Sequence, residues 1–569
     1  MSMQPRPWPE VPAGTARVAR AAFRKGALAI RARDRLGSWY EDERFAAVYG
    51  VRGAPGISPA QLAMVSVLQF CENLTDRQAA DAVRGRLDWK YALGLALEDE
   101  GFDFSVLSEF RARLVAGGLE RAIFDGLLGR LKDLGLVQAG GRQRTDSTHV
   151  LGRIRDLNRL ELAGETLRAA LEVLAAAAPG WLAGVIGASW QRAYGQPVAD
   201  MRLPAGKAAR TQLAVRYGRD GYHLLEAARA PGAPPWLASL PAVEALRRVW
   251  VQQYYRETGA GGEKVIWREA GLAGQGLPPG RSRIVSPYDL DARYSEKRGK
   301  GWTGYKVHIC ETCSDAADDD PRTRLAPVPN LITGVATTGA AVADAAMTRP
   351  ICDMLDAAGL PPGELAVDAG YTSVELLLDA RRRGITLLGP MMADNSPQAR
   401  AGGYTTSAFA IDWDSRQVTC PQSATSSGWN PFRDRAGDEH IAVKFPAATC
   451  RACPARAKCT TSRTGRQLFL RPRHLHEALA AARAGQDSQH WKNRYAIRAG
   501  VEGTIAQATC VTGIRRSRYP GLAKTRLEHN TAAAAINLIR LNAWWTGRPL
   551  DRTRTTHLQR LALNTADPE

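Results

Sequence analysis

One eight-residue segment near the C-terminal end of the sequence restricts the fold more than any other feature. Residues 495–502 read Tyr-Ala-Ile-Arg-Ala-Gly-Val-Glu. In an α-helix this spacing would project Tyr495, Arg498 and Glu502 from nearly the same face. A carboxylate beside a guanidinium on one helical face suits a metal site that handles phosphate. Such a site needs further carboxylates from elsewhere in the chain.

Two aspartates provide these carboxylates in similar surroundings. Asp146 lies in Arg-Thr-Asp-Ser-Thr-His, and Asp368 lies in Leu-Ala-Val-Asp-Ala-Gly-Tyr after a short apolar run. An acid at the end of a buried strand fits an α/β layer, where the ends of adjacent strands converge. A lone aspartate is more often a cap or a turn, and we assign Asp289 and Asp291 to a loop on this ground. The joint occurrence of the three acids therefore carries the argument.

These local patterns, in this order, resemble the DDE transposases of bacterial insertion sequences, in the group with a Y-x2-R-x3-E motif. The resemblance covers most of the chain and is most specific in residues 491–541. It implies a ribonuclease-H-like core in which Asp146, Asp368 and Glu502 are catalytic and bind two Mg²⁺ ions, which Mn²⁺ could replace. It also implies cleavage of the ends of the element, joining of the 3′-hydroxyl to target DNA, and a homodimer or higher oligomer on paired ends.

The charge of the chain agrees with a polyanionic partner such as double-stranded DNA. The chain has 76 Lys+Arg and 57 Asp+Glu residues, a net charge of +19. Residues 451–475 and 514–526 contain seven and five basic residues respectively and no acidic ones, and basic clusters neutralise phosphates. The alternative is a solubilising, arginine-rich surface.

The resemblance assigns DNA phosphate contacts to Tyr495 and Arg498. It departs from the wider family pattern at Thr509, where a lysine is expected seven residues after the glutamate. We expect the missing charge to come from residues of the second basic segment, namely Arg515, Arg516, Arg518 and Lys524. Gly500 and Gly503 weaken the helix beside Glu502 and would leave room for a DNA backbone.

Four cysteines form a candidate zinc site, with the spacing C-x29-C-x2-C-x5-C at Cys420, Cys450, Cys453 and Cys459. The C-x2-C pair is typical of half a tetrahedral zinc site, while the other half is looser than in a regular ribbon. The alternative is a set of free thiols. His149 is assigned to a hydrogen-bonded structural role or to shaping the site.

The sequence predicts an α/β protein in five parts. Residues 1–140 form a helical N-terminal domain, with capping boxes at Ser58–Gln61 and Thr75–Gln78 and a third helix from Ser105. It is either a helix-turn-helix DNA reader or a plain bundle, and the resemblance favours DNA binding. Residues 141–390 form the first part of the core, interrupted by a helical insertion at about 152–285. A Cys-rich, zinc-ribbon-like insertion (391–485), the second part of the core with the glutamate helix (486–545) and a basic tail (546–569) follow.

The absence of an apolar leader or a membrane-like span favours a cytoplasmic, nucleoid-associated protein. Two alternative functions remain. The chain is a DNA-binding regulator or inactive transposase remnant, or it is a ribonuclease-H-like nuclease that cuts without joining.

Overall fold

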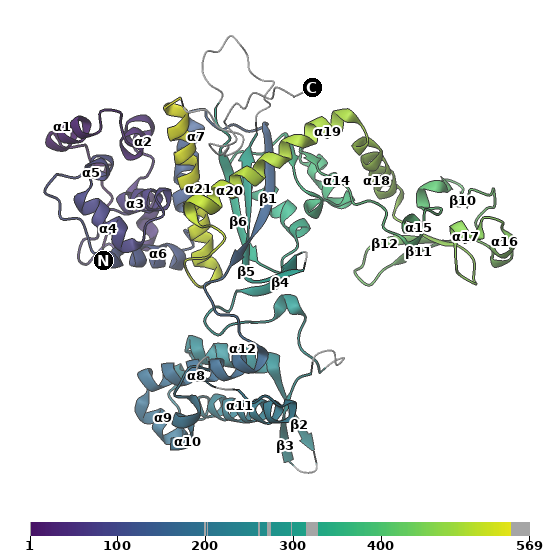
Figure 1. Cartoon of the computed structure of the whole chain (residues 1–569), viewed down its shortest axis with the longest axis horizontal. Coiled ribbons are helices and arrows are strands. Elements are labelled where there is room, and N and C mark those ends of the chain that lie inside the picture. Colours follow the sequence, from purple (N-terminus) through teal and green to yellow (C-terminus); the bar gives the residue numbers. More distant parts are fainter. Residues whose placement is uncertain are drawn as a thin grey trace, which may run out of the picture.

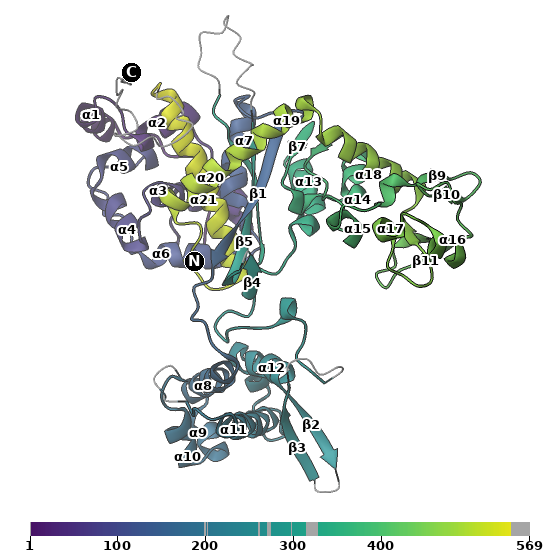
Figure 2. The same ribbon diagram turned by 45° about the vertical axis from the view of Figure 1, so that its right-hand side comes forward.

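The computed structural model is a mixed α/β protein in which a central sheet is flanked by three other units (Figures 1 and 2). It describes residues 2–198, 201, 203–259, 262–269, 275–297, 299–313 and 328–547. The predicted basic tail lies almost entirely outside these residues. Within them, no helix combines the length and apolar character needed to cross a membrane.

The N-terminal domain is helical, as predicted. Its helices are α1 (Ala13–Ala22), α2 (Leu28–Leu36), α3 (Pro59–Cys71), α4 (Asp76–Gly85), α5 (Leu87–Leu93), α6 (Ser105–Ala116) and α7 (Ala122–Asp133). Helix α3 begins after Ser58, whose hydroxyl accepts the Gln61 N–H at 3.2 Å. Helix α4 begins with a complete capping box between Thr75 and Gln78. These caps satisfy N–H groups that a helix leaves unpaired at its start.

The central sheet carries the order β4-β5-β1-β7-β8, and β6 also pairs with β5. Its strands are β1 (Arg142–Leu151), β4 (Arg293–Lys297), β5 (Lys300–Thr312), β6 (Ile332–Gly339), β7 (Glu364–Ala366) and β8 (Thr386–Leu388). Strand β5 is antiparallel to β1, β4 and β6, whereas β1, β7 and β8 are mutually parallel. The strands predicted around β5, β6 and β7 are confirmed.

Helices cover both faces of this sheet. Since successive strand residues point to opposite faces, a single strand contributes side chains to two hydrophobic cores. One face packs with the N-terminal helices, α20 (Gly500–Thr512) and α21 (Leu522–Trp545) in the largest hydrophobic core of the described residues, to which β5 contributes Ile309. The other face packs against α13 (Thr348–Ala357) and α14 (Val374–Arg382), and here β5 contributes Cys310. The N-terminal domain is therefore continuous with the core.

The helical insertion lies below the sheet in Figure 1 and has a hydrophobic core of its own around Tyr217 and Trp250. Its elements are α8 (Arg159–Ala177), α9 (Pro179–Val185), α10 (Ala188–Tyr194), α11 (Lys207–Ala227), α12 (Pro241–Gln253), β2 (Tyr254–Gly259) and β3 (Gly262–Trp267). The sequence predicts the helices but not the β2–β3 hairpin. Its strands are short and largely exposed, so they lack the apolar run of a buried strand.

The Cys-rich insertion projects from the opposite side of the sheet to the N-terminal domain (Figure 1). It contains α15 (Pro397–Arg400), β9 (Ala410–Asp412), β10 (Gln417–Thr419), β11 (Gly428–Arg433), β12 (Glu439–Lys444), α16 (Ala447–Ala452), α17 (Arg456–Cys459) and β13 (Gln467–Leu470). Helices α18 (Arg473–Gln486) and α19 (Gln489–Ala496) then lead back to the sheet.

Candidate active site

Asp146 lies in the middle of β1, the strand between β5 and β7. Its side chain is 11% exposed, and its carboxylate accepts the Ser147 N–H at 2.7 Å and the guanidinium of Arg498. Burial raises the pKa of Asp146 above its ordinary value, although Arg498 opposes this effect and favours the carboxylate. The Asp368 carboxylate contributes to the raised pKa by like-charge repulsion.

The register of the sheet explains why Asp146 and Asp368 are close. Strands β1 and β7 run parallel, and Arg144 is paired with Ala366. Asp146 and Asp368 each follow these partners by two residues, so they come level with each other at the end of β7. Asp368 caps the short 3-10 turn that follows, where its Oδ1 accepts the Gly370 N–H at 2.8 Å.

Arg498 joins the first and third acids of the predicted site. Of its two terminal nitrogens, Nη2 donates to Asp146 and Nη1 donates to Oε1 of Glu502 at 2.8 Å. The predicted continuous helix is instead divided. Tyr495 lies in α19, Arg498 in a 3-10 turn (Ile497–Ala499), and Glu502 in the first turn of α20. The three side chains nevertheless remain together, because the whole segment keeps right-handed helical dihedral angles.

The Tyr495 side chain lies beside these charged groups. Its ring stacks on that of Trp491, with centroids 4.8 Å apart. Burial raises the pKa of Tyr495, while the nearby Arg498 lowers it and the acids Asp368 and Asp146 raise it. The hydroxyl therefore stays protonated at neutral pH and is available as a hydrogen-bond donor.

The donor chemistry of the three acids suits a divalent cation, because Mg²⁺ prefers carboxylate oxygens. Glu502 is 65% exposed, so its side chain is free to reorient. However, among the described residues no three His, Cys, Asp or Glu side chains are arranged so as to hold a metal ion. Arg498 lies between Asp146 and Glu502, and ligation by both acids would require its guanidinium to turn away.

A buried charge network holds α20 against the sheet. The Glu311 carboxylate of β5 is fully buried and accepts from Arg144 of β1 and Arg540 of α21, each at 2.7 Å, and from the Thr504 hydroxyl at 2.6 Å. Although burial opposes ionisation, the two arginines keep the pKa of Glu311 below its ordinary value. The network thus fixes the helix that bears Glu502.

Arg144 also explains the glycine beside Glu502. Its guanidinium donates to the carbonyl of Ile497 at 2.7 Å, one residue before Arg498. A Cβ at Gly500 would overlap this guanidinium, whereas a Cβ at Gly503 would meet nothing within 4 Å. The expectation that Gly500 leaves room for DNA is therefore wrong, because Arg144 occupies that space. Gly503 faces open space.

The sequence did not single out a fourth acid in this region. Asp344 is 14% exposed, and its Oδ1 accepts from Lys306 at 3.1 Å and from the Ser147 hydroxyl at 3.2 Å. A Cβ at Gly370 would lie 3.4 Å from Oδ2 of Asp344 and 3.0 Å from Oδ1 of Asp368, so both carboxylates flank this turn. The available signal was an acid just after the β6 strand, which resembles an ordinary loop aspartate.

The predicted DNA-binding residues lie in different environments. Arg515 donates to the Thr148 hydroxyl at 2.9 Å, two residues along β1 from Asp146. Arg516 and Lys524 are exposed. Arg518 instead docks on the N-terminal domain, where its guanidinium lies 4.2 Å from the Phe70 ring centroid and donates to the Leu74 carbonyl at 3.1 Å.

Two further residues of the motif have local roles. The Thr509 hydroxyl, at the position where a lysine is expected, donates to the Ile505 carbonyl of its own helix at 2.7 Å. The His149 ring lies 5.8 Å from that of Trp302, and its burial lowers its pKa. Asp289 lies in a loop, as predicted, where it accepts the Tyr305 hydroxyl at 2.6 Å.

The four cysteines of the predicted zinc site line one pocket of about 280 Å³ in the Cys-rich insertion. Sγ of Cys450 accepts the Arg466 N–H at 3.4 Å, and burial raises the pKa of Cys459. All four are free thiols. Within the part of the chain that the structure describes, their side chains are not arranged so as to hold a metal ion.

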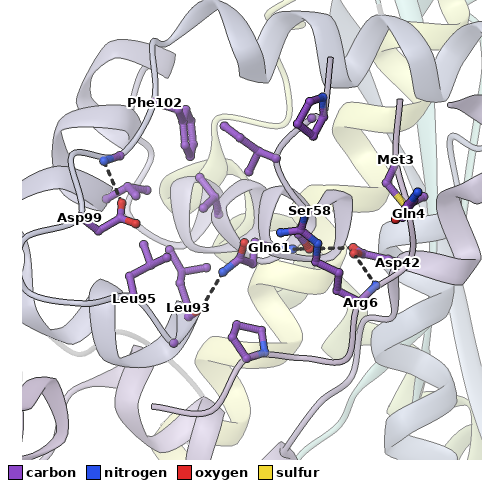
Figure 3. Close-up of a pocket in the computed structure, with 18 of the residues that line it drawn as sticks. Met3, Gln4, Arg6, Asp42, Ser58, Gln61, Leu93, Leu95, Asp99 and Phe102 are labelled. Atoms are coloured by element: carbon purple, nitrogen blue, oxygen red, sulfur yellow. Dashed lines mark hydrogen bonds between the residues drawn. The ribbon is translucent and has the colours of Figure 1, made fainter. Parts of the chain in front are cut away.

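A second cavity, of about 630 Å³, lies in the N-terminal domain (Figure 3). Asp42 accepts hydrogen bonds from the Arg6 N–H and the Ser58 hydroxyl, and Gln61 donates to the Leu93 carbonyl. These polar groups satisfy one another, so we assign them to the packing of the N-terminal segment.

Two family models match the chain. The model described as "Transposase DDE domain" matches residues 419–542, which include Glu502 but neither aspartate. The model described as "Transposase domain (DUF772)" matches residues 26–113, from before α2 into α6. No curated protein and no solved structure gives a significant match. Two segments of the chain are thus similar to transposase domains, which is consistent with an insertion-sequence DDE transposase.

Proposed function

We propose that the protein binds the terminal inverted repeats of its insertion sequence, cleaves the ends by metal-dependent phosphodiester hydrolysis and joins the 3′-hydroxyl to target DNA. The observation that carries this proposal is the convergence of Asp146, Asp368 and Glu502 around Arg498, although the three acids are 222 and 134 residues apart in sequence. An ordinary ion pair between Arg498 and Glu502 on the surface of a helix would not require the two distant aspartates to lie beside it.

The sheet supports assignment of the core as ribonuclease-H-like. A central strand bears the first acid, an antiparallel hairpin extends one side of it, and two parallel strands extend the other. Asp368 follows β7, the first of these parallel strands, and Glu502 lies on α20, which packs on one face of the sheet.

In the proposed reaction, Asp146, Asp368 and Glu502 would hold the catalytic ions. When bound, Mg²⁺ would supply positive charge at the phosphate and promote deprotonation of the attacking group. Arg498 would turn from Asp146 toward a phosphate oxygen, where its planar guanidinium donates two hydrogen bonds. The Tyr495 hydroxyl would donate to the same DNA strand. Arg515 and Arg516 follow α20 and would neutralise phosphates further along.

The other assignments complete this proposal. The N-terminal helices bind the inverted repeats, the four cysteines hold a structural zinc ion, and the protein acts in the cytoplasm as a dimer or higher oligomer on paired ends. Support for zinc comes from the shared pocket and from the C-x2-C pair.

The decisive experiment compares wild type with Glu502→Gln on DNA that carries the ends of the element. We expect Mg²⁺-dependent nicking and joining in wild type and neither in the variant. Glu477→Gln is a matched control, because Glu477 is an exposed helical glutamate that also accepts from an arginine four residues before it at 2.8 Å. It should retain full activity.

The same experiment separates the alternatives. Binding without cleavage by wild type would contradict the proposal and favour a DNA-binding regulator. Nicking without joining to a target plasmid would favour a nuclease. Activity retained by Glu502→Gln would remove Glu502 from the site.

A further inference from the structure

The Cys-rich insertion exposes one face of a small antiparallel sheet. Strands β11, β12 and β13 pair in this order, with Phe432 opposite His440 and Ala442 opposite Phe469. Because side chains alternate between faces, these residues share one face. The opposite face carries Val443 and Leu468, which are buried in the core of the insertion.

The exposed face carries a group of aromatic rings. Phe469 is 60% exposed and Phe432 is 38% exposed, although large apolar side chains in strands normally face a core. The rings of Phe432 and His440 are stacked with centroids 5.6 Å apart, and the Phe469 ring contacts Phe432 edge-on at 5.8 Å. The rings therefore form a continuous surface on top of an ordered sheet.

The remaining side chains of this face are uncharged or basic. Asn430, Lys444 and Gln467 share it by register, and no acidic side chain of the three strands does. At its edge, Asp434 directly follows β11 and lies 3.4 Å from Nε2 of His440. The strands β12 and β13 are joined by residues 445–466, which are basic in composition and contain no acidic residue, although Phe445, Cys450 and Cys459 of this segment pack on the opposite, core-facing side. The surface thus combines exposed rings, two amide side chains and Lys444.

This combination fits an unpaired nucleic acid strand better than a duplex or an apolar partner. Aromatic side chains on a sheet stack with the faces of splayed bases, amide side chains hydrogen-bond to base edges, and basic residues follow the phosphates. In a duplex the faces of the bases are stacked and inaccessible. A purely apolar partner would leave the exposed amide groups and Lys444 without hydrogen-bond partners.

We propose that the exposed face of β11–β13 binds unpaired bases of single-stranded DNA, with Phe432 and Phe469 as stacking residues. This binding goes beyond cleavage and joining and requires none of the three acids. Any DNA strand left unpaired beside a cut end would be a suitable ligand. The site is therefore testable without metal and without a reaction.

The test measures binding of the full-length protein to a fluorescent oligo-dT and to a duplex of equal length, in EDTA. We expect Phe432→Ala and Phe469→Ala each to weaken single-strand binding about tenfold, since loss of one stacking ring has effects of this order. Duplex binding should not change. Phe469→Tyr, which keeps the ring, should restore the affinity, and thermal unfolding should show that each variant is folded.

Trp236→Ala is the matched control, since the Trp236 ring is also exposed (47%) but lies in the helical insertion. Fluorescence of 2-aminopurine in the oligonucleotide reports stacking directly and should be quenched by wild type only. Equal single-strand affinity of wild type and the double variant Phe432→Ala/Phe469→Ala would overturn the proposal. So would a wild-type dimer that this double variant abolishes with oligo-dT binding unchanged, since the face would then contact a second copy. Because cleavage is not measured, these outcomes are independent of the proposed catalytic function.

Discussion

Glu528 provides a sharp test of the packing behind the active site. It lies in α21 and is almost fully buried. Its Oε2 accepts the Arg518 N–H at 2.9 Å and the Ser517 hydroxyl at 3.2 Å, whereas its Oε1 has no hydrogen-bond partner within the described residues. Burial raises the pKa of Glu528 from 4.5 to about 7. The Glu528 carboxyl group thus supports the turn that carries the proposed DNA-binding arginines, and it stabilises the fold most when it is protonated.

The sign of the pH dependence follows from this raised pKa. Between pH 4.5 and about 7 the folded protein keeps the Glu528 proton that the unfolded chain has already released. The contribution of Glu528 to the free energy of unfolding is therefore complete below pH 4.5 and is lost as the pH rises toward 7. At about 1.36 kcal/mol per pH unit, this interval corresponds to about 3 kcal/mol. Glu528→Gln removes the titrating group, so its stability should not show this component.

Hydrogen exchange of α21, measured by mass spectrometry at several pH values between 5 and 8, gives the local opening free energy after correction for intrinsic exchange. The difference between Glu528→Gln and wild type should grow in favour of the variant by up to about 3 kcal/mol across this range. Glu109→Gln is the control, because this exposed glutamate lies on α6, which packs against α21. A difference that stays constant with pH would refute the reasoning, whatever its absolute size.

Three further predictions concern the site and the insertion. Gly500→Ala should displace Arg144 and lower the cleavage rate at least about tenfold with DNA affinity retained, whereas Gly503→Ala should keep the rate; equal rates in both variants would contradict the assignment of Gly500. Glu311→Gln leaves two buried arginines without their carboxylate and should destabilise the fold by about 3–5 kcal/mol in urea unfolding; a loss below about 1 kcal/mol, typical of surface pairs, would show that water reaches the network. Purified protein should contain about one zinc ion per chain by atomic absorption, and Cys453→Ser about none, while equal metal content in both would count against the four-cysteine site.

The local parts of the fold were accessible from the sequence because their causes are local. The caps at Ser58 and Thr75 bond to residues three positions later, so four residues contain the whole interaction. The buried strand before Asp368 shows as an apolar run for the same reason. In contrast, Gly500 is required because Arg144 lies against it, and Arg144 also donates to the carbonyl of Ile497, a residue 353 positions away. No window of sequence around residue 500 contains that cause.

The candidate site was accessible for a different reason. The three acids were identified through local patterns that resemble a family, and the resemblance supplied the long-range information that the patterns lack. It could not supply what the patterns leave out. Asp344 precedes a helix in an ordinary context, and only the fold brings it beside Ser147 and the turn after Asp368. The exposed rings of β11–β13 could not be identified from the sequence either, because an aromatic residue in a short strand gives the same pattern whether it faces the core or the solvent.

The two aspartates and the glutamate also differ in how firmly the fold holds them. Backbone register alone sets Asp146 level with Asp368, so no side-chain substitution elsewhere should separate them. Glu502 depends on α20, whose position rests on side chains, namely Glu311 with Arg144 and Arg540. The third acid is therefore the adjustable one, and it is also the most exposed of the three. Substitutions in the Glu311 network should accordingly impair steps that need Glu502 while leaving the Asp146–Asp368 pair intact.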